Sequence, residues 1–342
     1  MITQQCSFLD FLARENDRFT IPFYQRSYTW TPRQCAELWE DLQRAGVQQR
    51  SHYMSMIIFR PAELLPDGTV VHDVIDGQQR IATLTILLTA LVEHLRETAT
   101  CVGGLSADEM EANYVLGGAH DVQGKRPSKL QLLQADDDCL QALIDGQEAP
   151  SASRVGKNFA YFHNAMAQAD FDANTLWRGL QQLLIISVQL SETDNAQAIF
   201  ESLNVKGLPL STADLVRNYL LVAETREEQQ RLYAEYWNPI QLMFGEDKSS
   251  LKLNAGIRMW LTIRFQKQRI RDKSQTYTVF KNYMTQEFDG TTEDLLDELR
   301  SFCLMWAENY KFNEVKEFRG MDWAKRGQNK TLLPGWGHQS GF

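Results

Sequence analysis

The segment from Thr69 to Arg96 constrains the fold most, because its pattern changes from strand to helix within a few residues. Thr69 to Ile75 is rich in β-branched residues, which is typical of a strand. Asp76-Gly77 breaks that pattern, and a helix is predicted from about Gln79 to Arg96. The expected buried face of this helix consists of Ile81, Leu84, Leu87, Leu88, Leu91 and Leu95. The polar residues concentrate at the turn, so chemistry is expected there.

The turn reads Asp73-x-x-Asp76-Gly77-Gln78-Gln79-Arg80 and has the residue types of an anion site. The first backbone N–H groups of a helix lack partners within it and carry partial positive charge, so they favour phosphate. Arg80 adds a planar fork of donors for the same anion. Asp73 and Asp76 supply the hard oxygen ligands that a hydrated divalent cation prefers. The alternative is a structural turn, in which Asp caps the helix and Gly supplies backbone freedom.

A second candidate is Tyr24-Gln25-Arg26, within the aromatic-rich extended segment from Ile21 to Trp30. Aromatic faces stack on bases, and Gln or Arg side chains read base edges or phosphates. The alternative is a hydrophobic strand with alternating faces. A helix is predicted directly after this segment, with Thr31 as N-cap, Pro32 at its first position and Gln34 completing a capping box.

The remaining patterns predict an α/β domain followed by a mainly helical one. Strands are expected at 54–59 and 183–190, and a loop at 61–68. Residues 98–128 are glycine-rich and irregular, and 226–310 are almost all helical in pattern. A helix at 194–203 and a turn at 204–207 precede a helix in which Ser211 and Asp214 form a capping box, which is the simple explanation of Asp214.

The formal net charge of −9 argues against a surface that coats nucleic acid indiscriminately, but not against a local basic groove. Two groups of basic residues are candidates for contacts to a DNA backbone. One contains Arg264, Lys267, Arg269 and Arg271, and the other contains Lys125, Arg126 and Lys129. The alternative for both is a solvated helix face.

Several classes of protein find no support in the sequence. The longest nearly apolar run, 81–92, is too short to span a bilayer, and the N-terminus lacks a signal-peptide pattern, so a cytoplasmic protein is expected. The five cysteines are scattered, without a C-x-x-C pair. The segment 118–125 is not a Walker loop, because its glycine spacing is wrong, and the sequence contains no zinc-protease motif. A nucleotide enzyme here would be of a non-Walker kind.

Three blocks in order resemble the N-terminal domain of GmrSD-type restriction proteins, which is similar to the ParB/sulfiredoxin fold. The resemblance covers about residues 8–222, and a looser one extends to about 310. The blocks are Ile21-Pro22-x-Tyr24-Gln25-Arg26-x-Tyr28-x-Trp30, Asp73-x-Ile75-Asp76-Gly77-Gln78-Gln79-Arg80-x-x-Thr83-Leu84, and Ala198-Ile199-Phe200-Glu201-x-Leu203-Asn204-x-x-Gly207-x-x-Leu210-x-x-x-Asp214-Leu215.

The resemblance implies binding and hydrolysis of a nucleoside triphosphate with Mg²⁺, and action on modified or phage DNA. GTP, CTP, UTP and ATP are not distinguished. It nominates Asp76, Gln78, Gln79 and Arg80 as catalytic residues. The nucleotide-binding residues that it implies are the same four, Gly77, and the segment Tyr24, Gln25 and Arg26. That segment is also implicated in sensing DNA. It places the ParB-like domain at 1–100 plus 183–222, a helical insertion at 101–182 and a helical region at 223–342.

The chain departs from the family pattern at two places. Full-length members continue into a His-Asn-His nuclease domain, whereas the only late histidine here is His338, so a nuclease partner is one expectation. Met54-Ser55-Met56 stands where the family often has glycine. Two functions remain as alternatives: a non-catalytic sensor of modified DNA, and a ParB-like nuclease that nicks DNA with a metal at Asp73 and Asp76.

Overall fold

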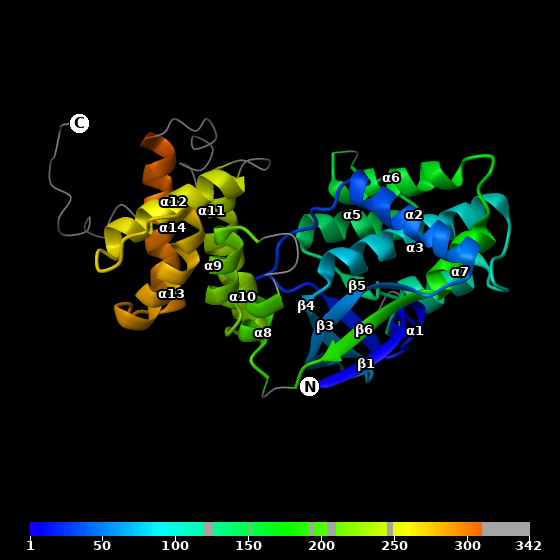
Figure 1. Cartoon of the computed structure of the whole chain (residues 1–342), viewed down its shortest axis with the longest axis horizontal. Coiled ribbons are helices and arrows are strands. Elements are labelled where there is room, and N and C mark those ends of the chain that lie inside the picture. The colour runs from blue at the N-terminus through cyan, green and yellow to red at the C-terminus, as the bar shows by residue number, and fades with distance from the viewer. Residues whose placement is uncertain (119–125, 151, 192–193, 204–209, 245–248, 310–342) are drawn as a thin grey trace. The chain divides into compact units, whose positions relative to one another are not determined.

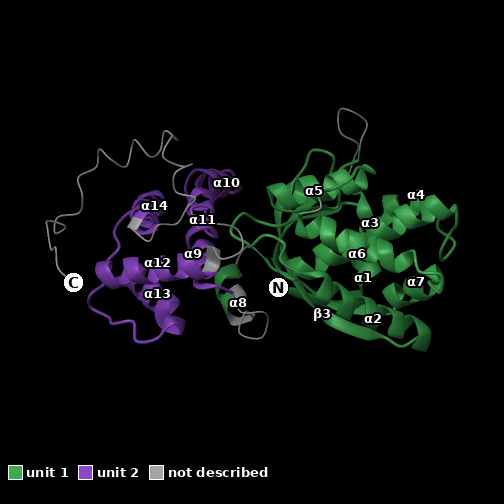
Figure 2. Ribbon diagram, turned by 90° about the horizontal axis from the view of Figure 1, so that it is seen from above, with its two compact units in different colours: residues 1–203 green, residues 204–342 purple. Residues whose placement is uncertain are grey.

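The computed structural model describes residues 1–118, 126–150, 152–191, 194–203, 210–244 and 249–309 (Figure 1). The chain divides into two compact units, Met1–Leu203 and Asn204–Phe342 (Figure 2). The domain assignment expected from the sequence joins 183–222 to 1–100, and it stays a prediction. The expected turn at 204–207 lies outside the described residues.

Unit 1 is built on a mixed sheet of six strands, in the order β1-β6-β3-β4-β2-β5. The β1/β6 and β3/β4 pairs are antiparallel, and the other neighbours are parallel. The strands are β1 (Ile2–Ser7), β2 (Asp17–Thr20), β3 (His52–Leu64), β4 (Val70–Asp76), β5 (Leu130–Gln131) and β6 (Leu183–Gln189). The strands predicted at 54–59, 69–75 and 183–190 are thereby confirmed within β3, β4 and β6.

The predicted loop at 61–68 is wrong in its first half, because β3 continues to Leu64. Proline within a strand removes a donor from the ladder and is tolerated at bulges. The register of β3 against β4 shifts between Pro61 and Glu63, so this strand has the irregularity that proline requires. β1, β2 and β5 were not predicted, since they are short and lack an alternating apolar pattern.

Helices of unit 1 gather over the sheet, and Figure 1 shows α2, α3, α5 and α6 on one side of it. The helices are α1 (Phe8–Leu12), α2 (Pro32–Gln48), α3 (Gln78–Thr98), α4 (Ala107–Met110), α5 (Gln134–Ile144), α6 (Arg154–Met166), α7 (Ala173–Gln181) and α8 (Ala196–Leu203). Within α3, every residue from Ile81 to Val92 is buried, so this helix is enclosed on all sides and not on one face as predicted. One continuous core runs from Phe8 to Ile185 and includes residues of the expected insertion.

The start of α2 confirms the capping prediction. The backbone N–H of Thr31 donates to Oε1 of Gln34 over 2.9 Å, and Pro32 occupies the first turn. This cap ends the extended segment 21–30 abruptly, because proline at the first helical position has its φ already set for a helix. The segment that carries Tyr24 is therefore held between β2 and a fixed helix start.

The described residues of unit 2 form helices joined by turns and contain no strand, as expected for 226–310. Its core is aromatic, with Trp237, Trp260, Phe265 and Phe280 almost fully buried. The helices are α9 (Thr212–Leu221), α10 (Arg226–Leu232), α11 (Asn238–Leu242), α12 (Ser249–Arg264), α13 (Thr276–Gln286) and α14 (Thr292–Asn309), with a π-helical turn at Tyr233–Trp237 and a short 3₁₀ turn at Lys273–Gln275. Ser211 and Asp214 form the predicted capping box of α9. None of the described helices in either unit has the length and apolar character of a membrane span.

Candidate functional site

The predicted turn joins β4 to α3 as expected, and Gly77 is the residue that makes it possible. Its φ is +98°, in the left-handed region that favours glycine. A Cβ atom at this position would lie 3.1 Å from Cγ1 of Ile57 on β3. The tight turn and the close approach of β3 therefore both require glycine.

The N-terminus of α3 has no side-chain cap. The N–H groups of Arg80 and Ile81 both donate to the carbonyl of Gly77 over 3.0 Å. Among the described residues, nothing accepts from the N–H groups of Gln78 and Gln79. Two backbone donors are thus available at the positive end of a helix of 21 residues, which favours an anion.

Asp76 and Arg80 form the charged part of the turn. Nη2 of Arg80 donates to Oδ2 of Asp76 over 3.0 Å, and Nη1 donates to the hydroxyl of Ser55 on β3. The side chains of Asp76 and Arg80 are 32% and 24% exposed, so solvent reaches both groups. Local sequence patterns do not reveal the Ser55 contact, because it joins separate elements.

Gln79 holds the segment 27–30 against α3. Its Oε1 atom accepts from the backbone N–H groups of Thr29 at 2.8 Å and Trp30 at 3.2 Å, and its Nε2 donates to the carbonyl of Ser27 over 3.2 Å. The side chain is buried. Both ends of the amide are therefore engaged with this segment. Its predicted direct roles stay predictions.

Replacement of this side chain tests the clamp. Gln79→Ala removes the partner of two backbone donors and one carbonyl in a buried place, and we expect it to destabilise unit 1 by about 2 kcal/mol. Urea unfolding followed by circular dichroism measures the loss. Gln181→Ala is the matched control, because Gln181 is an exposed glutamine at the end of α7. Equal midpoints for the two variants would contradict the clamp.

The structure brings Tyr24 and Gln25 against β4. Nε2 of Gln25 donates to the carbonyl of Ile75 over 2.9 Å. Tyr24 is only 1% exposed. Burial raises the pKa of its hydroxyl well above the usual range, and the nearby Asp73 carboxylate adds to this effect. Tyr24 thus stays protonated at neutral pH. Neither side chain can stack on a base or reach DNA in this conformation, and their predicted role in DNA contact stays a prediction.

Tyr28 anchors the same segment from the other side. Its hydroxyl lies 2.6 Å from Oγ1 of Thr83 on α3 and accepts from Nδ2 of Asn158 on α6 over 2.8 Å. Its backbone N–H donates to Oδ2 of Asp136 over 2.7 Å. Burial raises the pKa of both Tyr28 and Asp136. Asn158 and Asp136 carried no sequence signal, since Asn158 stands alone in a helical pattern and nothing distinguishes Asp136 within the run of three aspartates at 136–138.

A small cavity separates Arg26 from the first turn of α3. Arg26, Tyr28, Gln78 and Gln79 are among the residues that line it, and its volume of about 10 Å³ corresponds to roughly one water molecule. Gln78 is 9% exposed, and its Oε1 atom is buried without a hydrogen-bond partner among the described residues. Such an atom costs free energy unless a ligand or water satisfies it. The two predicted groups thus meet here.

The predicted metal ligands are each engaged with an arginine. Asp73 is nearly buried and accepts from Nη2 of Arg60 on β3 over 3.3 Å, whereas Asp76 is paired with Arg80. A cation bound by both carboxylates would displace both arginines. Asp76 is the more exposed of the two and the more accessible to a cation from solvent.

The basic side chains of the larger group differ in whether an acidic side chain pairs with them. In unit 2, Arg264 makes two hydrogen bonds to Glu298 at 2.6 and 2.8 Å, and Lys267 is paired with Glu287 at 2.5 Å. Arg269 and Arg271 are exposed, and no acidic partner is found for them in the described part of this unit.

Lys129 does not belong to a surface patch, so the smaller basic group is wrong as predicted. It is 2% exposed, and its Nζ donates to the carbonyl of Asn113 over 2.7 Å and to that of Leu12. Burial lowers its pKa to about 8. The side chain ties segments together inside unit 1, and Lys125 lies outside the described residues.

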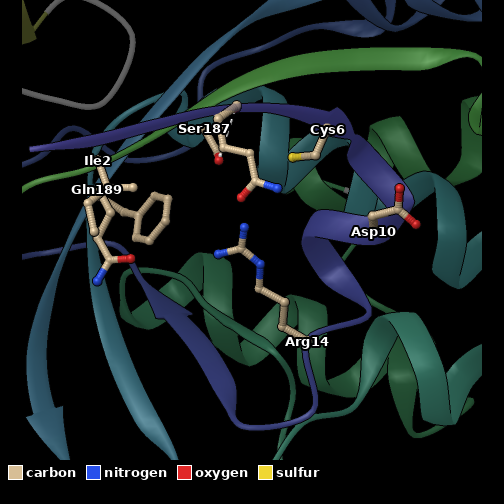
Figure 3. A pocket seen from close by; sticks show the side chains of 8 residues that line it. Ile2, Cys6, Asp10, Arg14, Ser187 and Gln189 are labelled. Atoms are coloured by element: carbon tan, nitrogen blue, oxygen red, sulfur yellow. Dashed lines mark hydrogen bonds between the residues drawn. The ribbon is translucent and has the colours of Figure 1, made fainter.

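A larger cavity of about 310 Å³ lies in unit 1 and contains none of the predicted site residues (Figure 3). The guanidinium of Arg14 points into it, and Cys6, Ser187 and Gln189 lie around it. Burial raises the pKa of the Cys6 thiol, so this cysteine is not an activated thiolate. Sequence reasoning missed this cavity because it forms where β1, which the pattern did not predict, pairs with β6.

The comparison with known families bears on the whole of unit 1. The chain matches the family described as GmrSD restriction endonuclease, N-terminal domain, over residues 8–221. That range includes the turn at Asp76 and the Tyr24–Arg26 segment. No curated protein matches the chain significantly. Since the match covers more than half of the 342 residues, the chain belongs to the family of GmrSD restriction endonuclease N-terminal domains.

Proposed function

We propose that this chain is the nucleotide-hydrolysing and DNA-sensing component of a restriction system, with phosphate bound at the N-terminus of α3. Family membership ties the chain to DNA restriction, and hence to DNA as a partner. The observation that carries the nucleotide proposal is the uncapped start of α3, where the N–H groups of Gln78 and Gln79 have no acceptor in the described structure. Arg80 stands beside them with solvent access.

In the proposed mechanism Arg80 exchanges partners. It leaves the Asp76 carboxylate for an incoming phosphate, whose charge its planar donor fork matches better. Asp76 is then free to hold a hydrated Mg²⁺, for which its carboxylate oxygens are suitable ligands. Bound Mg²⁺ supplies neutralisation of the charge that builds on the phosphate. Asp73, three residues earlier on β4 and engaged with Arg60, supports this arrangement.

Gln78 is the residue that we propose to orient the attacking water. Its Oε1 atom is buried and has no partner among the described residues. The cavity that it lines with Arg26 has room for about one water molecule. Gln79 is less suited to this task because its amide is already used on Ser27, Thr29 and Trp30.

The same contacts suggest how nucleotide and DNA are linked. Gln79 ties the start of α3 to the segment 27–30, so a movement of either end is transmitted to the other. We propose that the Tyr24–Arg26 segment, in which Tyr24 and Gln25 are buried, moves outward when modified DNA binds, while Arg269 and Arg271 contact the DNA backbone. A ParB/sulfiredoxin-like relationship of the sheet and α3 is part of this proposal and is supported by the strand, tight turn and helix at 70–98.

The test is phosphate release by the purified chain with Mg²⁺ and each of the four common nucleoside triphosphates, with and without modified DNA. We expect release with at least one nucleotide, and faster release with the DNA that the chain senses. Binding of modified DNA without any release would refute hydrolysis. That result would favour the non-catalytic sensor, for which the small volume of the cavity beside Gln78 is the supporting observation.

A further inference from the structure

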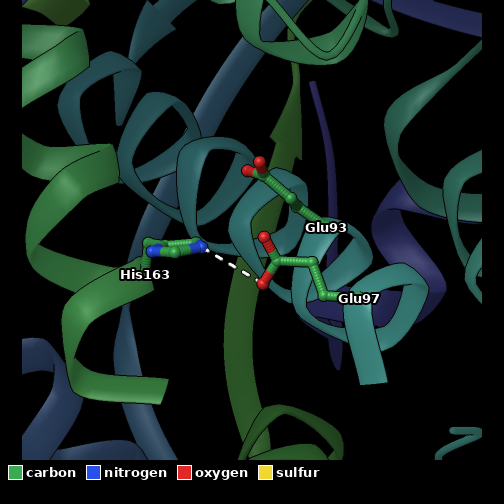
Figure 4. A group of neighbouring side chains, drawn as sticks. All are labelled: Glu93, Glu97 and His163. Carbon is green, nitrogen blue, oxygen red and sulfur yellow. Dashed lines mark ion pairs between the residues drawn. The ribbon is translucent and has the colours of Figure 1, made fainter. Parts of the chain in front are cut away.

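Two glutamates and a histidine converge on one surface of unit 1, away from the site at the start of α3 (Figure 4). Glu93 and Glu97 lie one helical turn apart on α3, and His163 projects toward them from α6. One ligand atom from each of the three side chains lies within 4.8 Å of the other two. Glu93 is 15 residues from Gln78, which corresponds to about 22 Å along the helix.

The negative charge of this cluster is poorly compensated. Like charges four residues apart on a helix repel one another. Glu93 has no ion pair or hydrogen bond within the described part of the chain, and Glu97 has only the 3.4 Å pair with Nε2 of His163. Arg96 is next to Glu97 in the chain, yet it binds Asp108 and Glu111 on the neighbouring helical segment. Among the described residues, the imidazole of His163 is therefore the one side chain that pairs directly with this cluster, while His94 interacts with Glu97 only electrostatically.

The backbone positions of the three residues are fixed by packing. Leu95, which lies between Glu93 and Glu97 in the sequence, and Phe162, which precedes His163, are almost completely buried. The ring of His163 lies against that of Phe159, with centroids 6.1 Å apart and planes 22° from parallel. Sites carried on packed helices are preorganised, which reduces the entropy lost when a ligand binds.

We propose that Glu93, Glu97 and His163 bind a divalent transition-metal ion such as Zn²⁺ or Co²⁺. An imidazole with two carboxylates suits first-row transition metals, whereas Mg²⁺ prefers oxygen ligands alone. Ligand atoms around tetrahedral zinc are about 3.3 Å apart for bonds of about 2.0 Å, so the glutamate side chains must close by up to about 1.5 Å. Glu93 is partly exposed and Glu97 is exposed, so both carboxylates are accessible from solvent. Bound metal joins α3 to α6 and leaves coordination positions open to solvent.

The test is titration of the metal-free full chain with Co²⁺, followed by visible absorption, and the shift in unfolding temperature with Zn²⁺. We expect one bound ion per chain and a higher unfolding temperature when it is bound, since a ligand of the folded state stabilises it. His163→Asn should abolish both effects. Glu93→Gln should weaken metal binding at least about tenfold without harming the fold. Loss of a residue that only hydrogen-bonds a metal ligand already weakens affinity by about this factor, and Glu93 is proposed as a ligand itself.

His52→Asn is the matched control. His52 forms a surface pair with Asp41 at 3.6 Å, in which no third ligand takes part among the described residues. This variant should bind Co²⁺ as the parent does. Absence of binding in the parent, or binding that persists unchanged in His163→Asn and Glu93→Gln, would overturn the proposal. Neither result bears on phosphate release, so the two proposals fail separately.

Discussion

Replacement of Arg80 by alanine should lower the rate of phosphate release by about 100-fold to 1000-fold. Arg80 lies in the first turn of α3 with its side chain partly exposed, and its guanidinium is held ready by Asp76 and Ser55. Removing a donor that stabilises charge in the transition state lowers the maximal rate more than it lowers affinity. Arg80→Lys should restore only a small part of the rate, since an ammonium group lacks the planar fork.

Two further measurements separate this role from an effect on folding. Arg33→Ala removes an exposed arginine of α2 that is paired only with Glu37 in the described structure, and its phosphate release should equal that of the parent. Circular dichroism should show that Arg80→Ala is folded. Nucleotide binding that survives in Arg80→Ala while release is lost would locate the effect in the chemical step. Unchanged release in Arg80→Ala would exclude Arg80 from catalysis.

Local patterns predicted the parts of the fold that depend on neighbouring residues. The change from β-branched residues to helical periodicity located β4 and α3, and Gly77 between them has the positive φ that such a turn requires. Proline and glutamine at the start of α2 were equally local signals. β1 could not be predicted in this way, because its polar sequence forms a strand only through pairing with β6, which is far away in the chain.

In the candidate site, too, the features set by neighbouring residues were predictable and those set by distant residues were not. The residues of the turn were identified from their order, since a helix start exposes backbone donors wherever it occurs. Their partners were not, because the contacts join distant segments: Asn158 reaches Tyr28 across 130 positions, and Gln25 reaches Ile75 across 50. Packing against distant segments also buries Tyr24 and Gln25, for which the sequence left open both contact with DNA and a place in a hydrophobic strand.

Replacement of Gly179 by alanine should destabilise unit 1 by about 3 kcal/mol, because α2 and α7 approach too closely to admit a methyl group. A Cβ atom on Gly179 would lie 2.1 Å from the carbonyl oxygen of Leu42, and one on Gly46 would lie 2.0 Å from that of Thr175. Two glycines facing opposite backbones allow this approach. Neither clash can be relieved by rotating a side chain, since the atom met is backbone oxygen, so the helices must separate.

The control for this prediction is the same substitution in a helix with more room. A Cβ atom on Gly256 of α12 would lie 3.4 Å from Cδ1 of Trp306, an ordinary contact. Gly256→Ala should leave stability unchanged or raise it by about 1 kcal/mol, because alanine favours helix over glycine. Urea unfolding of both variants measures the difference. If Gly179→Ala is as stable as Gly256→Ala, then α2 and α7 do not pack through their glycines. The helical layer over the sheet would then be assembled differently, and with it the support for α3.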